Sequence, residues 1–328
     1  MRSNNDIRNI RNRYIEVINE PGFSIQLEQI NQKWKLADIP GAEIWREDLE
    51  TLNIITNITT KHPADINEYL NRIYNSIEFG PLKKPVYCGY YFTREVNAGM
   101  MEFPEGYLFL VNRDLLLSIY TSVLPVILSG HSWTENGRRL PPAINYEQAA
   151  KFLRDNLDYI MDLGKEFHEL NSTLLSELMW EFLVTNSAIG YVMAHEYCHA
   201  SLGHKTSRDD NKTMVHEVEA DEHAMNIYIS RAIEKYTRNE FERAAWLTGP
   251  PLVMIMSMIL EKRGYYQQGG HPSSLSRLVR IKEKMEAVLK NTIGYKLSWN
   301  FISHYINIAE IAGMIELRQL YVKEIDWK

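Results

Sequence analysis

Residues 194–200 carry the sequence AHEYCHA, which contains the pattern His-Glu-x-x-His from His195 to His199. In an α-helix, side chains four positions apart project from the same face, so these two histidines would lie one turn apart. Two neutral imidazoles at that spacing can bind one Zn²⁺, and Glu196, rotated slightly off their face, can act on a zinc-bound water. The segment therefore predicts an active-site helix that carries half of a zinc site.

A second segment, EVEAD at residues 217–221, can supply the missing ligand. The polar residues 205–213 predict a turn between two helices, so the second segment would return beside the first. Three protein ligands would leave the fourth zinc position open for water, as in a catalytic rather than a structural zinc site. Glu217 and Asp221 lie four positions apart on the second helix, and Glu219 is an alternative ligand to Glu217.

Composition limits the class of protein. The chain has 328 residues, a net charge of −6 and two cysteines. This length suits one large or two small domains, and the charge gives no basic surface for a nucleic-acid partner. Two cysteines make no disulfide framework, and Cys198 inside the histidine pattern suits a reducing cytoplasm. The basic N-terminus lacks the apolar core of a signal peptide, and the best apolar run, residues 107–128, is interrupted by Arg113 and Asp114. We therefore expect a soluble, cytoplasmic protein without a membrane span.

The periodicity of apolar residues predicts a mostly helical α+β fold with a small sheet. Strands are predicted at residues 86–93 and 107–111, with a turn at 104–106 before the second strand and a loop at 130–142. Residues 97–111 form either a core hairpin or an edge strand that pairs with a peptide substrate. The domain boundary is expected near residue 85, with an N-terminal subregion at 1–85 and a catalytic domain at 86–328. Helices are predicted at 63–79, from 114 onward, at 146–168, 171–203, 214–233, 239–263 and 273–290, and over much of the remaining chain.

The sequence HEYCHASLGH followed by EVEAD resembles the gluzincin metallopeptidases, especially the group of the CAAX prenyl protease and the heat-shock protease HtpX. That group carries HExxH, a further histidine five residues later, like His204, and a Glu-x-x-Ala-Asp helix. It also carries an upstream Asn-Ala strand segment, similar to Asn97 and Ala98. A downstream His-Pro pair followed by arginine is similar to His271 and Arg277. This resemblance implies a zincin-like catalytic domain and a role in protein quality control.

The chain also resembles the family of the phage-exclusion peptidase Lit. That family has Glu-Pro-Gly-Phe near its start, HExxH with a histidine five residues later, Glu-x-Glu-Ala-Asp, and His-Pro-x-x-x-x-Arg. These elements are similar to residues 20–23, 195–204, 217–221 and 271–277. The chain departs from the usual HExxH pattern at Tyr197 and Cys198, which replace Leu-Gly, and in a long insertion before the metal helix. This second resemblance implies a soluble peptidase that cuts a host protein during phage defence.

Chemistry and resemblance together assign the roles. Zinc lowers the pKa of its bound water and polarises the scissile carbonyl, while Glu196 takes the water proton and passes it to the leaving amine. The resemblance implies that Glu217 is the third ligand and that Asp221 hydrogen-bonds His195 and fixes its ring. It also implies that His271 donates to the oxyanion or covers the zinc, and the alternative is an ordinary turn residue before Pro272. His204 is expected to have a structural role at the helix end. The residues expected at the substrate are Asn97, Ala98 and Arg277, the last of which is equally suited to a structural ion pair.

The resulting prediction is a zinc metalloendopeptidase with one Zn²⁺ per chain that hydrolyses a protein or peptide, in phage defence. A quality-control protease is an alternative. Another is an inactive or partner-gated protein that uses a peptidase fold for binding, and Glu196 argues against this because a binding module needs no general base. The last alternative is a helical interaction protein with a chance motif. Whether an activating ligand or partner controls the activity stays open.

Overall fold

The structure is a computed structural model that describes residues 4–18, 63–91, 96–130, 132–133, 139–161, 175–204, 210–236, 239–265 and 272–317. Contacts within the chain define two compact units. Unit 1 comprises Met1–Ser118 and Ile189–Ile227, and unit 2 comprises Ile119–Ala188 and Tyr228–Lys328. The boundary predicted near residue 85 stays a prediction.

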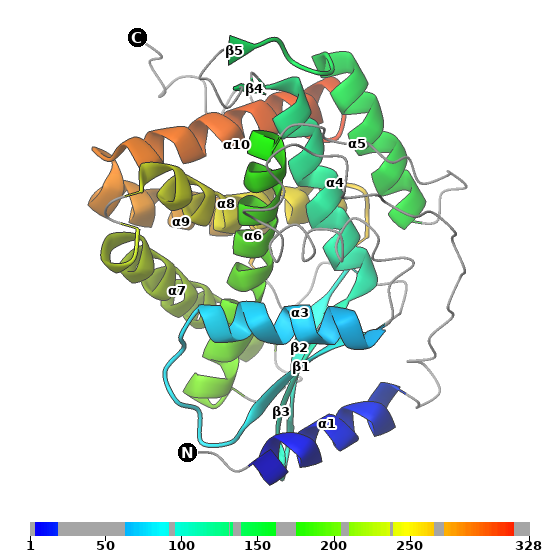
Figure 1. Cartoon of the computed structure of the whole chain (residues 1–328), viewed down its shortest axis with the longest axis vertical. Helices are drawn as coiled ribbons and strands as arrows, with labels where there is room; N and C mark the ends of the chain where they lie inside the picture. Colours follow the sequence, from blue (N-terminus) through cyan, green and yellow to red (C-terminus); the bar gives the residue numbers. More distant parts are fainter. Residues whose placement is uncertain are drawn as a thin grey trace. The chain divides into compact units, whose positions relative to one another are not determined.

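Unit 1 contains a three-stranded sheet with the order β1-β3-β2, formed by β1 (Val86–Tyr91), β2 (Ala98–Phe103) and β3 (Gly106–Asn112) (Figure 1). β1 runs parallel to β3, and β2 pairs antiparallel with β3 in a hairpin that places Phe103 opposite Gly106. All seven residues of β3 are buried, as expected for a central strand. The predicted strands and turn are confirmed within the described residues, and β2 is an edge of this sheet.

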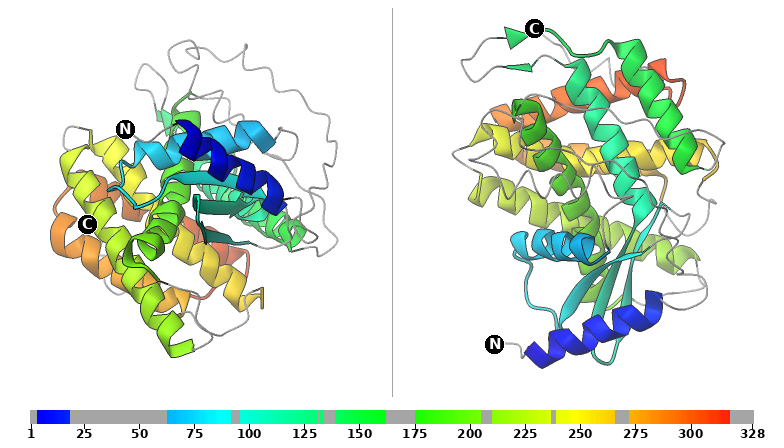
Figure 2. Two further views of the ribbon diagram at one scale, coloured as in Figure 1. Left: turned by 90° about the horizontal axis from the view of Figure 1, so that it is seen from below. Right: turned by 45° about the vertical axis from the view of Figure 1, so that its right-hand side comes forward.

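Two helices cover the sheet (Figure 2). α1 (Asn4–Ile18) packs its buried residues Ile10, Tyr14 and Val17 on apolar side chains of the strands. α3 (Pro63–Ser76) instead lies along the outer edge of β1. There the side chains of Asn67 and Asn71 form hydrogen bonds with the backbone of the strand. The backbone N–H groups of Cys88 and Tyr90 donate to Asn71 Oδ1 and Asn67 Oδ1 at 3.0 and 2.6 Å. These contacts satisfy an otherwise unpaired strand edge.

A series of aromatic contacts joins the sheet to the helix with the histidine pattern, α6 (Leu175–Leu202). The ring of Phe109 on β3 meets Tyr74 edge-on at 5.5 Å, and Tyr74 lies 4.9 Å from Phe79. Phe79 in turn stacks on Tyr197 of α6 at 4.5 Å, and the Tyr197 hydroxyl donates to Gly80 O at 3.1 Å. Tyr197 replaces the usual leucine of the HExxH pattern, and it fixes α6 to the segment between α3 and β1.

The helix after α6 begins earlier than the sequence indicated. Residues 205–213 were expected to form a turn, but α7 (Asp210–Glu234) already includes residues 210–213, and that part of the prediction is wrong. The physical reason is that polar residues also suit the first turn of a helix, where side chains remain solvated and an acidic residue complements the helix dipole. Residues 205–209 lie outside the described residues.

Unit 2 is built from helices and one short strand pair. Its helices are α4 (Arg113–Ser129) from Ile119 onward, α5 (Tyr146–Ile160), the first part of α6, the end of α7, α8 (Glu240–Lys262), α9 (Ser274–Leu289) and α10 (Ile293–Ile311). The region 130–142, predicted as loop, contains the antiparallel strands β4 (Ser132–Trp133) and β5 (Arg139–Leu140). Gly249 lets α8 approach α6 closely, since a Cβ there would lie 2.5 Å from the carbonyl carbon of Ser187.

The predicted fold class is confirmed in its general form, because the described residues are mostly helical with one three-stranded sheet. Among these residues, α8 alone is long and apolar enough to cross a membrane by length and composition. Its most apolar window is 78% buried inside the structure, and the core helix of a soluble protein has the same character.

We expect Tyr197→Ala to lower the free energy of unfolding by about 3 kcal/mol, because it deletes the buried aromatic contact between α6 and Phe79. Tyr197→Phe keeps the stacking and loses only the hydrogen bond to Gly80, so it should cost about 1 kcal/mol. Urea denaturation followed by circular dichroism measures both. Equal losses in the two variants would contradict the role of the aromatic stack.

Candidate metal centre

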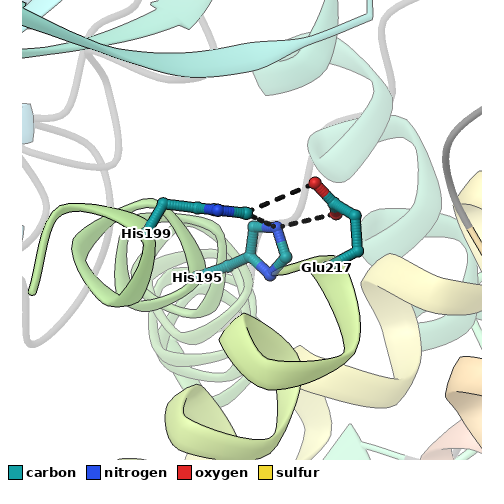
Figure 3. A group of neighbouring side chains, drawn as sticks. All are labelled: His195, His199 and Glu217. Atoms are coloured by element: carbon teal, nitrogen blue, oxygen red, sulfur yellow. Dashed lines mark hydrogen bonds and ion pairs between the residues drawn. The ribbon is translucent and has the colours of Figure 1, made fainter. Parts of the chain in front are cut away.

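Helices α6 and α7 bring three side chains of unit 1 together (Figure 3). His195 and His199 project from adjacent turns of α6, and their Nε2 atoms lie 3.1 Å apart. Glu217 projects from α7 toward both rings. Its Oε2 lies 3.2 Å from His195 Nε2, and its Oε1 lies 3.4 Å from His199 Nε2. This cluster could hold a metal ion, and none of its side chains is more than 15% exposed.

The spacing of these atoms fits a metal such as zinc. Zinc binds imidazole nitrogen and carboxylate oxygen at about 2.0–2.2 Å, so tetrahedral ligand atoms lie about 3.3–3.6 Å from one another. The two nitrogens lie 3.1 Å apart, and each lies 3.2 or 3.4 Å from a different oxygen of the Glu217 carboxylate. Two nitrogens and a carboxylate are also a donor set that leaves a fourth tetrahedral position open.

Asp221 lies behind His195, on the side of the ring opposite to the cluster. Its Oδ1 is 3.0 Å from His195 Nδ1, within ion-pair distance, and the same oxygen accepts a hydrogen bond from Tyr191 OH at 3.2 Å. A carboxylate at this nitrogen is the usual support for a metal-binding histidine. Tyr191 was not among the sequence candidates, because a tyrosine one turn before His195 on an apolar helix resembles an ordinary core residue.

His204 lies next to His199 at the end of α6. Its Nδ1 is 3.0 Å from His199 Nδ1, and its Nε2 is 3.0 Å from Glu219 Oε2. The pKa of His204 is lowered, chiefly by burial and also by His199 and His216, against the opposing effect of Glu219. Because Glu219 contacts His204 and is half exposed, the geometry favours Glu217 over Glu219 as the ligand.

Cys198 lies between the two cluster histidines in sequence, but its side chain is almost fully buried. Burial raises the pKa of its thiol to about 12, and the Asp221 carboxylate contributes to the increase. The thiol therefore stays protonated at neutral pH, whereas a thiolate is the form that binds a metal.

The remaining predicted site residues are placed as follows. Glu196 is half-buried on α6, directly after His195. Asn97 is exposed, and its carbonyl accepts a hydrogen bond from the backbone of Asn112, while Ala98 begins the edge strand β2. Arg277 lies on α9 in unit 2. His271 and residues 20–23 lie outside the described residues, and the roles expected for all of these residues stay predictions.

Comparison with known families gives a match. Residues 178–298 match a family model described as Peptidase U49. The match supports a peptidase. It spans every residue of the cluster, and a metal ion held there is consistent with a metallopeptidase. No curated protein and no solved structure matches the chain in the same comparisons.

Exchange of Glu217 for glutamine should remove the bound metal, because the amide loses the charge that faces both histidines. We expect about one zinc ion per chain in the reloaded wild type and close to none in Glu217→Gln, measured by elemental mass spectrometry after dialysis. Glu222→Gln, at an exposed position of the same helix, is the matched control and should keep its zinc. Loss of zinc from Glu219→Gln but not from Glu217→Gln would show that the ligand has been misassigned.

Proposed function

We propose that the protein is a zinc-dependent endopeptidase with a zincin-like, gluzincin-type catalytic site. One observation carries the proposal: the cluster of His195, His199 and Glu217 forms inside the segment that matches a peptidase family. The chemistry of the donor set supports zinc, since two histidines and a glutamate are typical ligands of catalytic zinc in peptidases.

In the proposed mechanism, His195, His199 and Glu217 hold the metal. When bound, zinc would polarise the substrate carbonyl and make water a stronger nucleophile near neutral pH. Glu196 follows His195 on α6 and lies outside the three-residue cluster, and we assign it the role of the base. It accepts a proton from the attacking water and delivers it to the nitrogen of the leaving amine. Asp221 keeps the His195 ring oriented during these steps.

The proposed substrate is a protein or peptide in extended form. β2 offers it an edge, because within the described sheet this strand pairs with β3 on one side only. A peptide that adds to such an edge gains backbone hydrogen bonds that do not depend on its sequence. We place Asn97 and Ala98 at the start of this edge as substrate-binding residues. His271 and Arg277 remain proposed as a catalytic and a substrate-binding residue on the basis of the resemblance.

We propose that the protein acts in the cytoplasm in defence against phage. In this role it cuts a host protein, and an activating ligand or partner can control the cleavage. The order of HExxH, EVEAD and the His-Pro…Arg segment supports this proposal through the resemblance to the Lit family. The match to Peptidase U49 is compatible with it. A quality-control protease is the alternative that the HtpX resemblance favours.

The chemical mechanism predicts that Glu196→Gln keeps its zinc and loses cleavage. A general base contributes about 10²–10⁴-fold to the rate, so peptide hydrolysis should fall by at least about 100-fold. The measurement combines zinc content with mass-spectrometric detection of cleavage products in a proteome digest. A Glu196→Gln protein that cleaves at the wild-type rate would refute the mechanism. Equal inactivity of wild type and variant, both with bound zinc, would favour the binding-protein alternative.

The biological proposal predicts that bacteria producing the wild-type protein resist infection by a phage that triggers it. Cells producing Glu196→Gln at the same level should be as sensitive as cells without the protein. Plaque counts over a phage panel measure this difference. Protection by the Glu196→Gln variant would show that phage defence does not depend on peptide hydrolysis. If the wild-type protein gives no protection but lowers the level of misfolded membrane or cytoplasmic proteins, the quality-control alternative is favoured.

A further inference from the structure

The backbone at the end of α6 fixes the position of His204. Gly203 adopts a φ of +70°, and its N–H donates to Ala200 O at 3.3 Å. The N–H of His204 donates to His199 O at 3.0 Å. These two bonds form a Schellman motif, in which a glycine in the left-handed region closes the helix and reverses the chain. The residue after the glycine is thereby returned to the turn that carries His199.

The side chain of His204 makes two polar contacts in series. Its Nδ1 hydrogen-bonds with His199 Nδ1 at 3.0 Å, and its Nε2 hydrogen-bonds with Glu219 Oε2 at 3.0 Å. The ring also stacks on His216 of α7, with centroids 4.2 Å apart and planes inclined by only 9°. The side chain is 8% exposed, whereas that of Glu219 is 50% exposed. The series therefore runs from the metal cluster to a carboxylate at the surface.

The protons along this series have only one consistent arrangement when a metal is bound. A neutral imidazole that gives its Nε2 lone pair to a metal carries its proton on Nδ1, so His199 donates from Nδ1. His204 must then accept at its own Nδ1, and its proton lies on Nε2. That proton is donated to the ionised carboxylate of Glu219. Each of the four atoms thus has a defined role as donor or acceptor.

We infer that His204 and Glu219 are positioning residues that fix the ring and the tautomer of His199, as Asp221 does for His195. His216 supports this pair by holding the His204 ring against α7. The inference rests on the proposed metal site and adds to it, since the two metal-binding histidines would be oriented by different groups. Asp221 acts on His195 directly, whereas Glu219 acts on His199 through a second imidazole.

Zinc affinity measures this role without any substrate. Loss of an orienting partner costs about 10–100-fold in metal affinity, so we expect that loss for His204→Phe in competition with a chromophoric chelator. His204→Asn should recover part of it, because the asparagine Oδ1 lies at the position of Nδ1 and can accept from His199. Glu219→Gln should cause a smaller loss, because the solvent around this half-exposed carboxylate weakens its effect. His223→Phe is the matched control, at an exposed position of α7.

Two spectroscopic measurements separate positioning from general stability. The visible d–d bands of the Co²⁺-substituted protein should change in His204→Phe and stay as in the wild type in His223→Phe. Long-range ¹H–¹⁵N NMR of the zinc-loaded wild type should show the proton of His199 on Nδ1 and that of His204 on Nε2. This second measurement requires no variant, so it holds even if a substituted protein fails to fold.

Wild-type zinc affinity and unchanged Co²⁺ bands in His204→Phe would overturn the inference while leaving the metal site intact. A zinc-bound wild type with the His204 proton on Nδ1 would overturn it as well. If the wild type binds no zinc, the proposed function fails together with the inference, and zinc content measured first distinguishes the two cases.

Discussion

The convergence of α6 and α7 on a cluster of three side chains that could hold a metal ion is the constraint on which the rest of the site depends. Two imidazole nitrogens and a carboxylate lie within 3.4 Å of one another in a largely buried position. Removing a carboxylate from water is costly unless a compensating charge or hydrogen bond is present. A metal ion at this point would provide that compensation, and the neighbouring residues can be understood by how they keep the three side chains aligned.

Several contacts of unit 1 serve this alignment. The stack of Tyr197 on Phe79 fixes α6 to the segment between α3 and β1. The hydroxyl of Tyr191 holds the carboxylate of Asp221 next to His195. The glycine turn at Gly203 returns His204 to His199. Rotation of α6 would disturb both the Tyr197 stack and the contacts of Asp221, because all of these side chains meet neighbouring turns of that helix. Rotation of α7 would break the contacts of Asp221. Rigid helices are a suitable support for a site that tolerates errors of only about 0.5 Å.

The sequence predicted the parts of this arrangement that follow from local spacing. Helical periodicity placed His195 and His199 on one face, and the polar segment followed by EVEAD indicated a second helix with the third ligand. The β2–β3 hairpin followed from the turn residues at 104–106.

Local spacing could not show which face of α7 packs toward α6, so the choice between Glu217 and Glu219 required the structure. Tyr191, Tyr197 and the side-chain contact of His204 were equally out of reach, since each depends on packing between elements that are distant in sequence or on a turn at the helix end. The start of α7 was misplaced because exposed helical residues and turn residues share a polar composition.

Metal content of the intact protein is the most direct measure of the central claim, that His195, His199 and Glu217 bind a zinc ion. The purified protein should be depleted with a chelator, reloaded and analysed by elemental mass spectrometry, with His195→Ala treated in parallel. We predict about one zinc ion per wild-type chain and close to none in the variant. A folded wild type without zinc after reloading would contradict the claim, and so would equal zinc content in the wild type and the variant.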